Sequence, residues 1–476
     1  MGGTTTVSDQ LRLMAAELGD EVAIKDVSRG DRLTFGEWEE RSNRLARGLT
    51  TVASVRPGDR VALLLPPTEP LDWVATYAAI HKAGAVAVPL NTRLAPSEVQ
   101  RLLDHAEARV VIRSTDDLPP LLADDASTYQ VPVGPDDLAD ILYTSGTTGT
   151  PKGVAVAHVN MSMLRAGRPT WSGRGWLTSS PLFTFAGITP IYSAMRLGMA
   201  VLHQPRFDVE EWLAVVEQER PTMVFLVPAM VELLAAHPAF GDADLTSLAL
   251  VYVGSSPLAP GLLQRLRDRV PRADVTNSYS LTESGSAFFS MPADEARKRV
   301  SSIGRPVPPT EVKVVDEAGD PVPAGEVGEL LLRVPGRMRH YYRDKTATAA
   351  TWQDGWLRSG DLARSDEDGY LYIVGRTKDV IIRGGNNIHA GDVEAVLYDH
   401  PAVLEATVAG IPHPVLGEDV AAWVVLRPGA TATPDDLQAH CAARLADYKT
   451  PRVITLVDAL PRNATGKVVK SLLTTL

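Results

Sequence analysis

A run of small, hydroxyl-bearing and basic residues at 143–153 has the composition of a phosphate-binding loop. It reads Tyr-Thr-Ser-Gly-Thr-Thr-Gly-Thr-Pro-Lys-Gly, so its glycines permit a tight turn whose backbone N–H groups converge on an anion. Lys152 adds a positive charge, and residues 138–143 predict a buried strand that places the loop at a strand end, where α/β sheets bind ligands. The spacing does not fit a Walker A loop. An ordinary surface turn is the alternative interpretation.

Four further clusters carry residues that suit a nucleotide site. Residues 277–283 offer an aromatic ring for a base and the Glu283 carboxylate for Mg²⁺ beside phosphates. Residues 356–361 end in Asp361, an acceptor for ribose hydroxyls, and residues 375–379 supply the Arg376 guanidinium. Residues 461–467 place Lys467 on a glycine turn. Taken singly, each has an equally good structural interpretation as a core tyrosine, a turn aspartate or a surface lysine.

The elements that must position these clusters alternate between helices and strands. Helices are predicted at about 71–82 and 97–105, each leading into a short apolar strand. The pattern repeats from about 160 to 266 with a helix at 209–219, and Thr34 and Thr433 are predicted to cap helices. Such alternation is typical of parallel sheets with crossover helices. After residue 303 short strands separated by Pro/Gly turns predict a small β-rich part, and a compact α+β unit follows residue 376. Residues 116–137 lack periodicity and read as a surface connection.

Composition restricts the classes of function. The chain has 476 residues, 45% hydrophobic and 22% charged, which predicts several globular parts with large cores. A net charge of −11 gives no general attraction to nucleic acid. We find neither a membrane-spanning run nor a signal peptide, and a single cysteine, Cys441, suits a reducing compartment. We therefore expect a cytoplasmic location, no nucleic-acid partner and no membrane span.

Together and in this order, the clusters resemble the motifs of the acyl-adenylate-forming superfamily, which includes acyl-CoA synthetases, peptide-synthetase adenylation domains and firefly-type luciferases. The resemblance covers about 34–467, and its most specific motifs are 143–153, 279–283, 359–361, 375–376 with 384–388, and 461–467. It implies an α/β fold with a large N-terminal AMP-binding domain, 1–377, of two doubly wound α/β subdomains plus a small distorted β-barrel. A small mobile α+β C-terminal domain, 378–476, would carry the catalytic lysine.

The resemblance implies a two-step reaction with ATP, Mg²⁺ and CoA. A carboxylate attacks the α-phosphate of ATP to give an acyl-adenylate and pyrophosphate, and the thiol of CoA then displaces AMP. A stand-alone ligase that loads a carrier protein is the alternative, and a nucleotide-binding regulator without catalysis is a remote one. A luciferase-like oxygenation is more remote still. Both monomers and dimers fit the resemblance, so the oligomeric state stays open.

The resemblance also assigns roles to individual residues. The catalytic set is Thr144, Thr282, Glu283, which is also the metal ligand, and Lys467, which would bridge the carboxylate and the α-phosphate. The ATP-binding set is Thr144, Ser145, Gly146, Thr147, Thr148, Gly149, Lys152, Gly254, Ser255, Ser256, Pro257, Asn277, Tyr279, Ser280, Thr282, Asp361, Ile373, Arg376 and Lys467. Lys378 would be the hinge of the C-terminal domain, and Gly384 and Gly385 would serve the thiol step.

Departures from the family pattern bear on the acid substrate. Thr184 replaces a bulky gate residue and predicts a wider entrance, while Ser280 stands where glycine is usual. Since no aspartate follows Phe183 to pair with an α-ammonium group, an amino-acid substrate is disfavoured. The predicted pocket is mainly apolar and favours an aliphatic, alicyclic or aromatic acid. Its residues are Phe183, Thr184, Phe185, Met230, Val253, Gly254 and Ser280.

Overall fold

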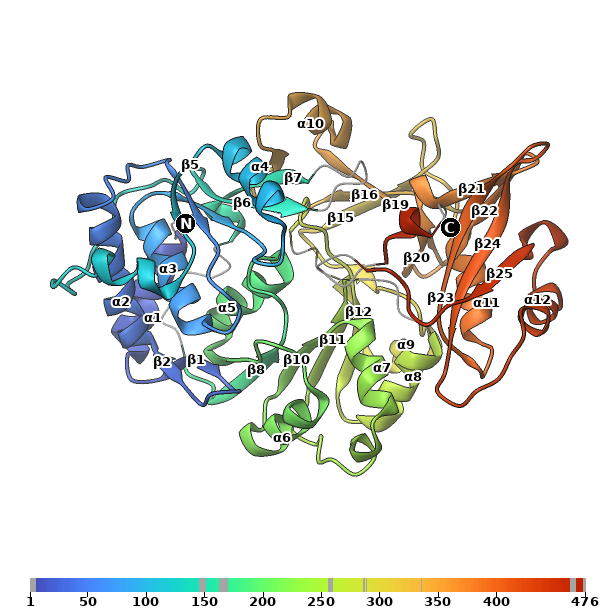
Figure 1. The fold of residues 1–476 in the computed structure, drawn as a ribbon, viewed down its shortest axis with the longest axis horizontal. Helices are drawn as coiled ribbons and strands as arrows, with labels where there is room; N and C mark the ends of the chain where they lie inside the picture. Colours follow the sequence, from blue (N-terminus) through green and yellow to red (C-terminus); the bar gives the residue numbers. More distant parts are fainter. Residues whose placement is uncertain are drawn as a thin grey trace.

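The computed structural model describes residues 6–144, 151–161, 170–255, 260–285, 287, 289–334, 336–462 and 468–473. In Figure 1 the N-terminal part lies on the left (blue to teal), the green segments lie below, and the orange to red C-terminal unit lies on the right. The predicted α/β class is confirmed, with large sheets in the N-terminal part and smaller ones toward the C-terminus. None of the helices in these ranges is long and apolar enough to cross a membrane.

One six-stranded sheet has the order β17-β7-β6-β4-β3-β5. Its strands are β3 (Arg60–Leu63), β4 (Val86–Pro89), β5 (Ala108–Ile112), β6 (Leu138–Thr144), β7 (Lys152–Ala157) and β17 (His340–Tyr341). The β3, β4, β5 and β6 pairings are parallel, as the helix–strand alternation predicted, and α3 (Pro70–Lys82) and α4 (Pro96–Ala106) are crossover helices. The β6–β7 and β7–β17 pairings are antiparallel. The phosphate-loop motif therefore joins the two strands of a hairpin.

A seven-stranded sheet has the order β12-β11-β10-β8-β9-β1-β2 and is parallel apart from the β1–β2 pair. Its strands are β1 (Val22–Asp26), β2 (Arg32–Thr34), β8 (Arg174–Thr178), β9 (Met199–His203), β10 (Met223–Leu226), β11 (Leu250–Gly254) and β12 (Asp274–Ser278). The helices of this half are α5 (Phe185–Leu197), α6 (Val209–Glu219), α7 (Pro228–Ala236) and α8 (Pro260–Arg269). Asp208 caps α6, whose bounds agree with the sequence pattern.

The β-rich part after residue 303 forms a five-stranded antiparallel sheet. Its strands are β15 (Glu311–Val315), β16 (Gly328–Arg333), β18 (Trp352–Gln353), β19 (Trp356–Ser365) and β20 (Leu371–Arg376). Register shifts on β19 bend this long strand, which suits the barrel-like curvature that the resemblance implied. The remaining short elements are β13 (Phe289–Ser290), β14 (Arg305–Pro306), α9 (Ala293–Lys298) and α10 (Lys345–Thr351).

The C-terminal unit has a sheet and a hydrophobic core of its own. Its elements are β21 (Val380–Arg383), β22 (Asn386–His389), α11 (Ala390–Tyr398), β23 (Val403–His413), β24 (Gly417–Leu426), α12 (Pro434–Ala442) and β25 (Val453–Leu456). Thr433 caps α12, as its sequence predicted. Cys441 lies in this core, and burial raises the pKa of its thiol to about 11, so the thiol packs rather than reacts.

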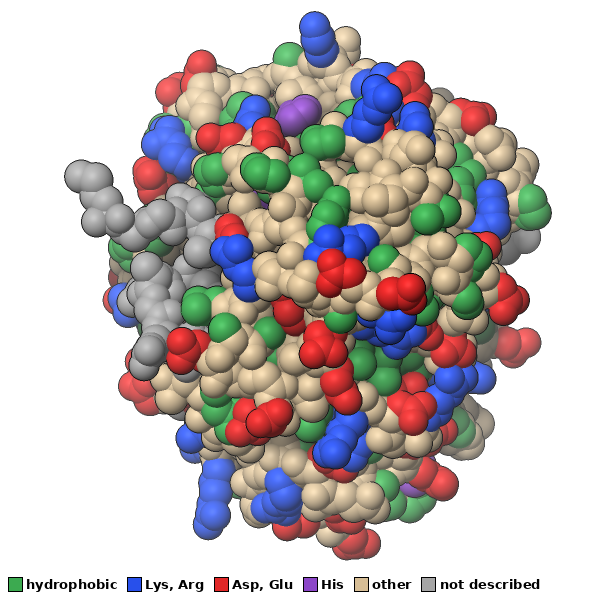
Figure 2. Space-filling model, turned by 90° about the vertical axis from the view of Figure 1, so that its left-hand side faces the viewer, with side chains coloured by type: hydrophobic (Ala, Val, Ile, Leu, Met, Phe, Trp, Pro, Cys, Tyr) green, Lys and Arg blue, Asp and Glu red, His purple; other side chains and the backbone are tan. Residues whose placement is uncertain are grey.

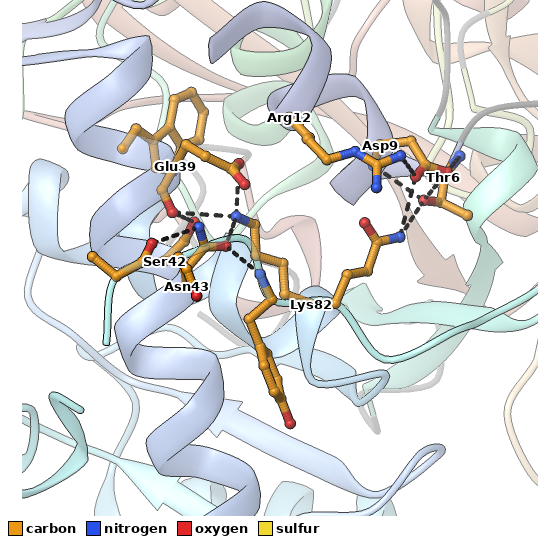
Figure 3. Close-up of polar contacts among 12 residues, drawn as sticks. Thr6, Asp9, Arg12, Glu39, Ser42, Asn43 and Lys82 are labelled. Carbon is orange, nitrogen blue, oxygen red and sulfur yellow. Dashed lines mark hydrogen bonds and ion pairs between the residues drawn. The ribbon is translucent and has the colours of Figure 1, made fainter. Parts of the chain in front are cut away.

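A buried polar network joins two helices of the N-terminal part to the segment 116–137 (Figure 3). The ammonium of Lys82, at the end of α3, lies 2.7 Å from Oε2 of Glu39 and 2.5 Å from Oδ1 of Asn43, both on α2 (Phe35–Thr51). Asn43 donates to the carbonyl of Ala126 at 3.2 Å, and the Lys82 carbonyl accepts from Val131 at 2.7 Å. The predicted surface connection is thus bonded to the helices beneath it.

The outer face of the N-terminal part carries mixed charge. In Figure 2 Lys and Arg side chains alternate with Asp and Glu across the coloured atoms of this face, and neither sign forms a continuous field. Charged side chains of the N-terminal part are also paired at short range, among them Arg60 with Glu107 at 3.2 Å. Such mixing is typical of a solvated surface.

Candidate active site

The ends of the phosphate-loop motif are held by the β6–β7 hairpin. Thr144 and Lys152 are directly opposite partners in its register, which brings the hydroxyl and the ammonium to the mouth of the loop. Residues 145–150, and with them the predicted ligands Ser145, Gly146, Thr147, Thr148 and Gly149, lie outside the described residues. The Lys152 ammonium lies 4.8 Å from the ring centre of Tyr341, a favourable cation–π distance.

Thr282 and Glu283 lie on a turn that follows β12 and is closed by a bridge between Leu281 and Gly285. Oε1 of Glu283 accepts hydrogen bonds from the Thr144 hydroxyl at 3.4 Å and from the Tyr341 hydroxyl at 3.1 Å. Burial and the Glu283 carboxylate raise the pKa of Tyr341, so its hydroxyl stays a donor at neutral pH. The structure therefore brings three of the four predicted catalytic residues to one place.

Lys467, the fourth predicted catalytic residue, lies outside the described residues. The chain on either side of it is described: Arg462 and Val468 form an antiparallel bridge, and Arg462 is paired with Glu405 at 2.8 Å. The described residues on both sides of Lys467 thus belong to the C-terminal unit.

A second cluster forms around Asp361, which is only 4% exposed. The Tyr279 hydroxyl donates to Oδ2 of Asp361 at 2.6 Å, and Nε of Arg376 donates to Oδ1 at 2.9 Å. Asp361 and Arg376 are register partners on β19 and β20, while Tyr279 comes from the loop after β12. Because a carboxylate offers about four acceptor sites, Asp361 keeps capacity for ribose hydroxyls.

The end of β11 approaches β12 closely. A Cβ atom on Gly254 would lie 2.5 Å from the Ser278 hydroxyl oxygen, so a larger residue would push the two strands apart. Ser255 has a φ of 76°, a strained value for a non-glycine residue that is often found at ligand sites. Ser256 and Pro257 lie outside the described residues.

The predicted acid pocket is only partly assembled from the residues named for it. Phe183, Thr184 and Phe185 lead into α5, where the Thr184 hydroxyl accepts from the Gly187 N–H at 3.1 Å and caps the helix. Val253 is fully buried in the hydrophobic core, against which Met230 packs. A small cavity of about 20 Å³ beside Phe185 is lined mainly by α5, β6 and β7 and has room for about one water molecule.

Three more residues that were predicted to bind the nucleotide lie near the second cluster. Asn277, at the end of β12, donates to the carbonyl of Ser301 at 3.2 Å. Ile373 on β20 is opposite Ala363 and packs against the main core. Ser280 has an exposed side chain.

The residues predicted for the hinge and the thiol step lie where the chain enters the C-terminal unit. Lys378 is exposed in a short turn, Thr377–Asp379, between β20 of one sheet and β21 of another. Gly384 and Gly385, with φ of 57° and 83°, form the two-residue turn between β21 and β22, a geometry for which two glycines are well suited. The tip of this hairpin is exposed.

Sequence reasoning missed two residues of the first cluster, Arg339 and Tyr341. Arg339 donates through Nη1 to the carbonyl of Thr282 at 2.5 Å. Arg339 precedes β17 and Tyr341 belongs to it, and this two-residue strand carries no recognisable motif. The only signal in the sequence is the run of basic and aromatic residues at 339–343.

The donor set suits magnesium that is held largely by a substrate. Within the described ranges no group of three or more His, Cys, Asp or Glu side chains is placed to hold a metal ion. Glu283 instead presents a single carboxylate beside a hydroxyl and a phosphate-loop lysine. Magnesium commonly takes one or two carboxylates together with phosphate oxygens and water.

Comparison with known proteins gives matches over nearly the whole chain. Residues 11–342 match the model described as AMP-binding enzyme, and residues 392–467 match the AMP-binding enzyme C-terminal domain. A feruloyl-CoA synthase of an Amycolatopsis species is 37% identical over 463 residues, with 93% of each chain covered. A fatty acid–[acyl-carrier-protein] ligase of Streptomyces coeruleorubidus is 32% identical, covering 93% of this chain and 91% of the relative.

Solved structures agree with this result. The o-succinylbenzoate CoA synthetase of Bacillus subtilis, in complex with the acyl-adenylate intermediate OSB-AMP, matches with a TM-score of 0.86 at 30% identity and covers 98% of this chain and 97% of that chain. The same enzyme has been solved with ATP and a magnesium ion.

Proposed function

The chain belongs to the AMP-binding enzyme family, and we propose that it joins an apolar carboxylic acid to the thiol of CoA at the expense of ATP. In the first step a carboxylate oxygen attacks the α-phosphorus, the new O–P bond forms, and the bond to pyrophosphate breaks. In the second step the CoA sulfur attacks the acyl carbon, the thiol proton is lost to solvent, and AMP leaves.

The convergence of two clusters supports this proposal most directly. Thr144, Lys152 and Glu283 form a phosphate end, while Tyr279, Asp361 and Arg376 form a nucleoside end. Thr282 and Tyr279 come from one short stretch of chain, so the two ends meet at the position where the α-phosphate would lie. A nucleoside triphosphate has the matching distribution of base, ribose and charge.

Each residue then has a defined task. The 144–152 loop binds the β- and γ-phosphates, and Thr282 contacts the α-phosphate. Tyr279 stacks on adenine while Asp361 accepts from the ribose. Magnesium, bound by Glu283 and the phosphates, would neutralise charge on the departing pyrophosphate. Lys467 would stabilise the negative charge that gathers between the carboxylate and the α-phosphate.

The acid and the acceptor are the finer part of the proposal. The apolar side chains of Phe183 and Phe185 support an aliphatic, alicyclic or aromatic acid. CoA is supported by relatives whose names specify CoA thioester formation, and one relative named for a carrier-protein substrate keeps that acceptor as the second candidate. The presence of both Glu283 and Lys467 argues against a regulator that has lost catalysis.

A panel of acids tests the proposal. Short, long-chain, aryl and polycyclic acids are each assayed for acid-dependent ATP/pyrophosphate exchange, and active acids are then offered to CoA and to a purified carrier protein in parallel. We expect exchange with at least one apolar acid and thioester formation on CoA. Exchange that stays at background with every acid would refute the proposal, and labelling of the carrier alone would select the second acceptor.

A further inference from the structure

A buried guanidinium lies against the turn that carries Thr282 and Glu283. Arg339 is 3% exposed, and among the described residues it forms no ion pair with a carboxylate. Burial lowers the pKa of Arg339 to about 10, so the group remains protonated at neutral pH. The carboxylates of Asp140 and Glu283 favour this charge through space, but neither forms an ion pair with it. Because burying a charge without a direct partner is costly, its retention calls for an explanation beyond packing.

Arg339 lies against two residues of the turn, Thr282 and Gly285. Nη1 donates to the Thr282 carbonyl at 2.5 Å, while a Cβ atom on Gly285 would lie 2.5 Å from Nη2. Gly285 has a φ of 76°, so glycine is favoured there both by backbone conformation and by the adjacent guanidinium. The turn is therefore hydrogen-bonded to the guanidinium at Thr282 and lies close against it at Gly285.

The same guanidinium reaches the predicted acid pocket. Its Cζ lies 5.0 Å from the ring centre of Phe185, within the range of a cation–π contact. Phe185 also lines the small cavity beneath α5. Arg339 thus joins a residue expected to touch the acid to the turn expected to touch the α-phosphate.

The neighbouring strand links this arrangement to the phosphate loop. Tyr341, two residues after Arg339, donates to Glu283 at 3.1 Å and stacks under Lys152. Its strand β17 pairs with β7, which begins at Lys152. Residues 339–341 consequently contact the turn, the loop strand and the acid pocket from a single short segment.

We propose that Arg339 is a positioning residue for the first half-reaction. It holds the 281–285 turn so that Glu283 faces the magnesium-bound phosphates, and it couples the position of that turn to the Phe185 side of the acid pocket. This inference rests on the proposed function, because it assumes that ATP and magnesium bind at Glu283.

The test measures ATP affinity by calorimetry in magnesium and in EDTA, so no acid needs to be known. In the unmodified protein magnesium should tighten ATP binding. In Arg339→Met the factor by which magnesium tightens ATP binding should fall about tenfold, which corresponds to the loss of one hydrogen bond from a charged group. Arg339→Lys keeps the charge and one donor, so it should recover part of the gain. Lys82→Met is the matched control, since it removes a buried cation whose partners, Glu39 and Asn43, lie on α2 and not on the 281–285 turn, so it should leave the magnesium effect unchanged.

The outcomes separate two failures. A normal magnesium effect in Arg339→Met, with only its melting temperature lowered, would overturn the inference and make the residue purely structural. Absence of ATP binding by the unmodified protein would overturn the proposed function itself. If Arg339→Met does not fold, Gly285→Ala replaces it, because the added Cβ displaces the guanidinium without removing its charge. An unchanged magnesium effect in that variant would likewise refute the inference.

Discussion

Lys82 and Arg339 are both buried cations, yet they are stabilised by different partners. Lys82 has a counter-charge, Glu39 at 2.7 Å, and an amide oxygen, Asn43 at 2.5 Å, on the neighbouring helix (Figure 3). Arg339 has a backbone carbonyl at 2.5 Å and the face of an aromatic ring. The first cation is paired directly with a carboxylate, whereas the charge of the second is opposed only through space, by the carboxylates of Asp140 and Glu283.

The difference indicates which charges serve stability and which serve chemistry. In an ion pair between packed helices the two charges compensate each other. Removing one partner lowers the free energy of unfolding, because the other charge stays buried without compensation. A cation held by neutral groups can instead position a turn or meet an anionic ligand as it arrives. Lys152, which contacts the ring of Tyr341 and forms no ion pair within the described residues, belongs to the second kind.

The largest effect is expected at Lys467, the lysine that the reaction is expected to need. Lys467→Ala should lower ATP/pyrophosphate exchange by about three powers of ten, because a cation about 4 Å from a developing charge contributes about 4 kcal/mol at an effective dielectric near 20. Thioester formation from a supplied acyl-adenylate should survive. Rates of the two half-reactions, measured separately, check this.

Lys470 provides the matched control for that experiment. It lies on the same tail but is paired with Glu394 at 2.9 Å and donates to the Val408 carbonyl at 2.8 Å. Lys470→Ala should therefore lower the melting temperature and leave exchange nearly unchanged. Equal loss of both half-reactions in Lys467→Ala would contradict the assignment of that lysine to the first step.

At Lys82 we expect a loss of stability without a loss of activity. Lys82→Met should destabilise the protein by about 3 kcal/mol, because it leaves the Glu39 carboxylate buried without its counter-charge. Thermal unfolding gives the stability loss, and kcat and KM at a temperature where the variant is folded should match the unmodified protein. The double variant Lys82→Met/Glu39→Gln should regain part of the loss. A changed KM for ATP would show that the two regions are coupled after all.

Asp361 tests the nucleoside end, where a buried carboxylate has partners but keeps acceptor capacity. Asp361→Asn should raise the KM for ATP by about thirtyfold, roughly 2 kcal/mol, since it weakens the ribose contact and the pair with Arg376. Tyr279→Phe removes only the hydroxyl at 2.6 Å and keeps the ring, so it should change KM much less. Steady-state kinetics at saturating acid compares them. If Tyr279→Phe raised the KM for ATP as much as Asp361→Asn does, the hydroxyl bond and not the carboxylate charge would account for the effect.

Much of the fold was predictable because it follows from local periodicity and caps. The helix Val209–Glu219 and the Thr34 and Thr433 caps follow from patterns that one segment carries by itself. The parallel pairing of β3, β4 and β6 follows from the alternation of helices and strands along the chain. The bonds that hold segment 116–137 were not predictable. They run from Arg44 and Asn43 to backbone carbonyls, which every residue type provides.

The site residues that belong to sequence motifs were predictable, and those outside motifs were not. The sequence placed Thr144, Glu283 and Asp361 in motifs, but it gave no reason for Tyr279 to bond Asp361 across 82 positions of the chain. Arg339 and Tyr341 were missed because tertiary pairing of β17 with β7, and no spacing rule, brings them to Glu283. Contacts made by such short strands depend on the assembled sheet.

The smallest expected effect is a difference in how the stability losses of Lys82→Met and Arg339→Met depend on pH. Burial lowers the pKa of Lys82 from its ordinary 10.5 to about 8, so above pH 8 the unfolded chain binds more protons than the folded one. The free energy of unfolding should then rise with pH, by at most about 1.4 kcal/mol per unit for this group. The gap in melting temperature between the unmodified protein and Lys82→Met should widen from about pH 7.5 to about pH 9.5. For Arg339→Met the gap should stay nearly constant, because the pKa of Arg339, about 10, lies above that window. A constant gap for Lys82→Met would mean that the folded protein keeps Lys82 protonated throughout.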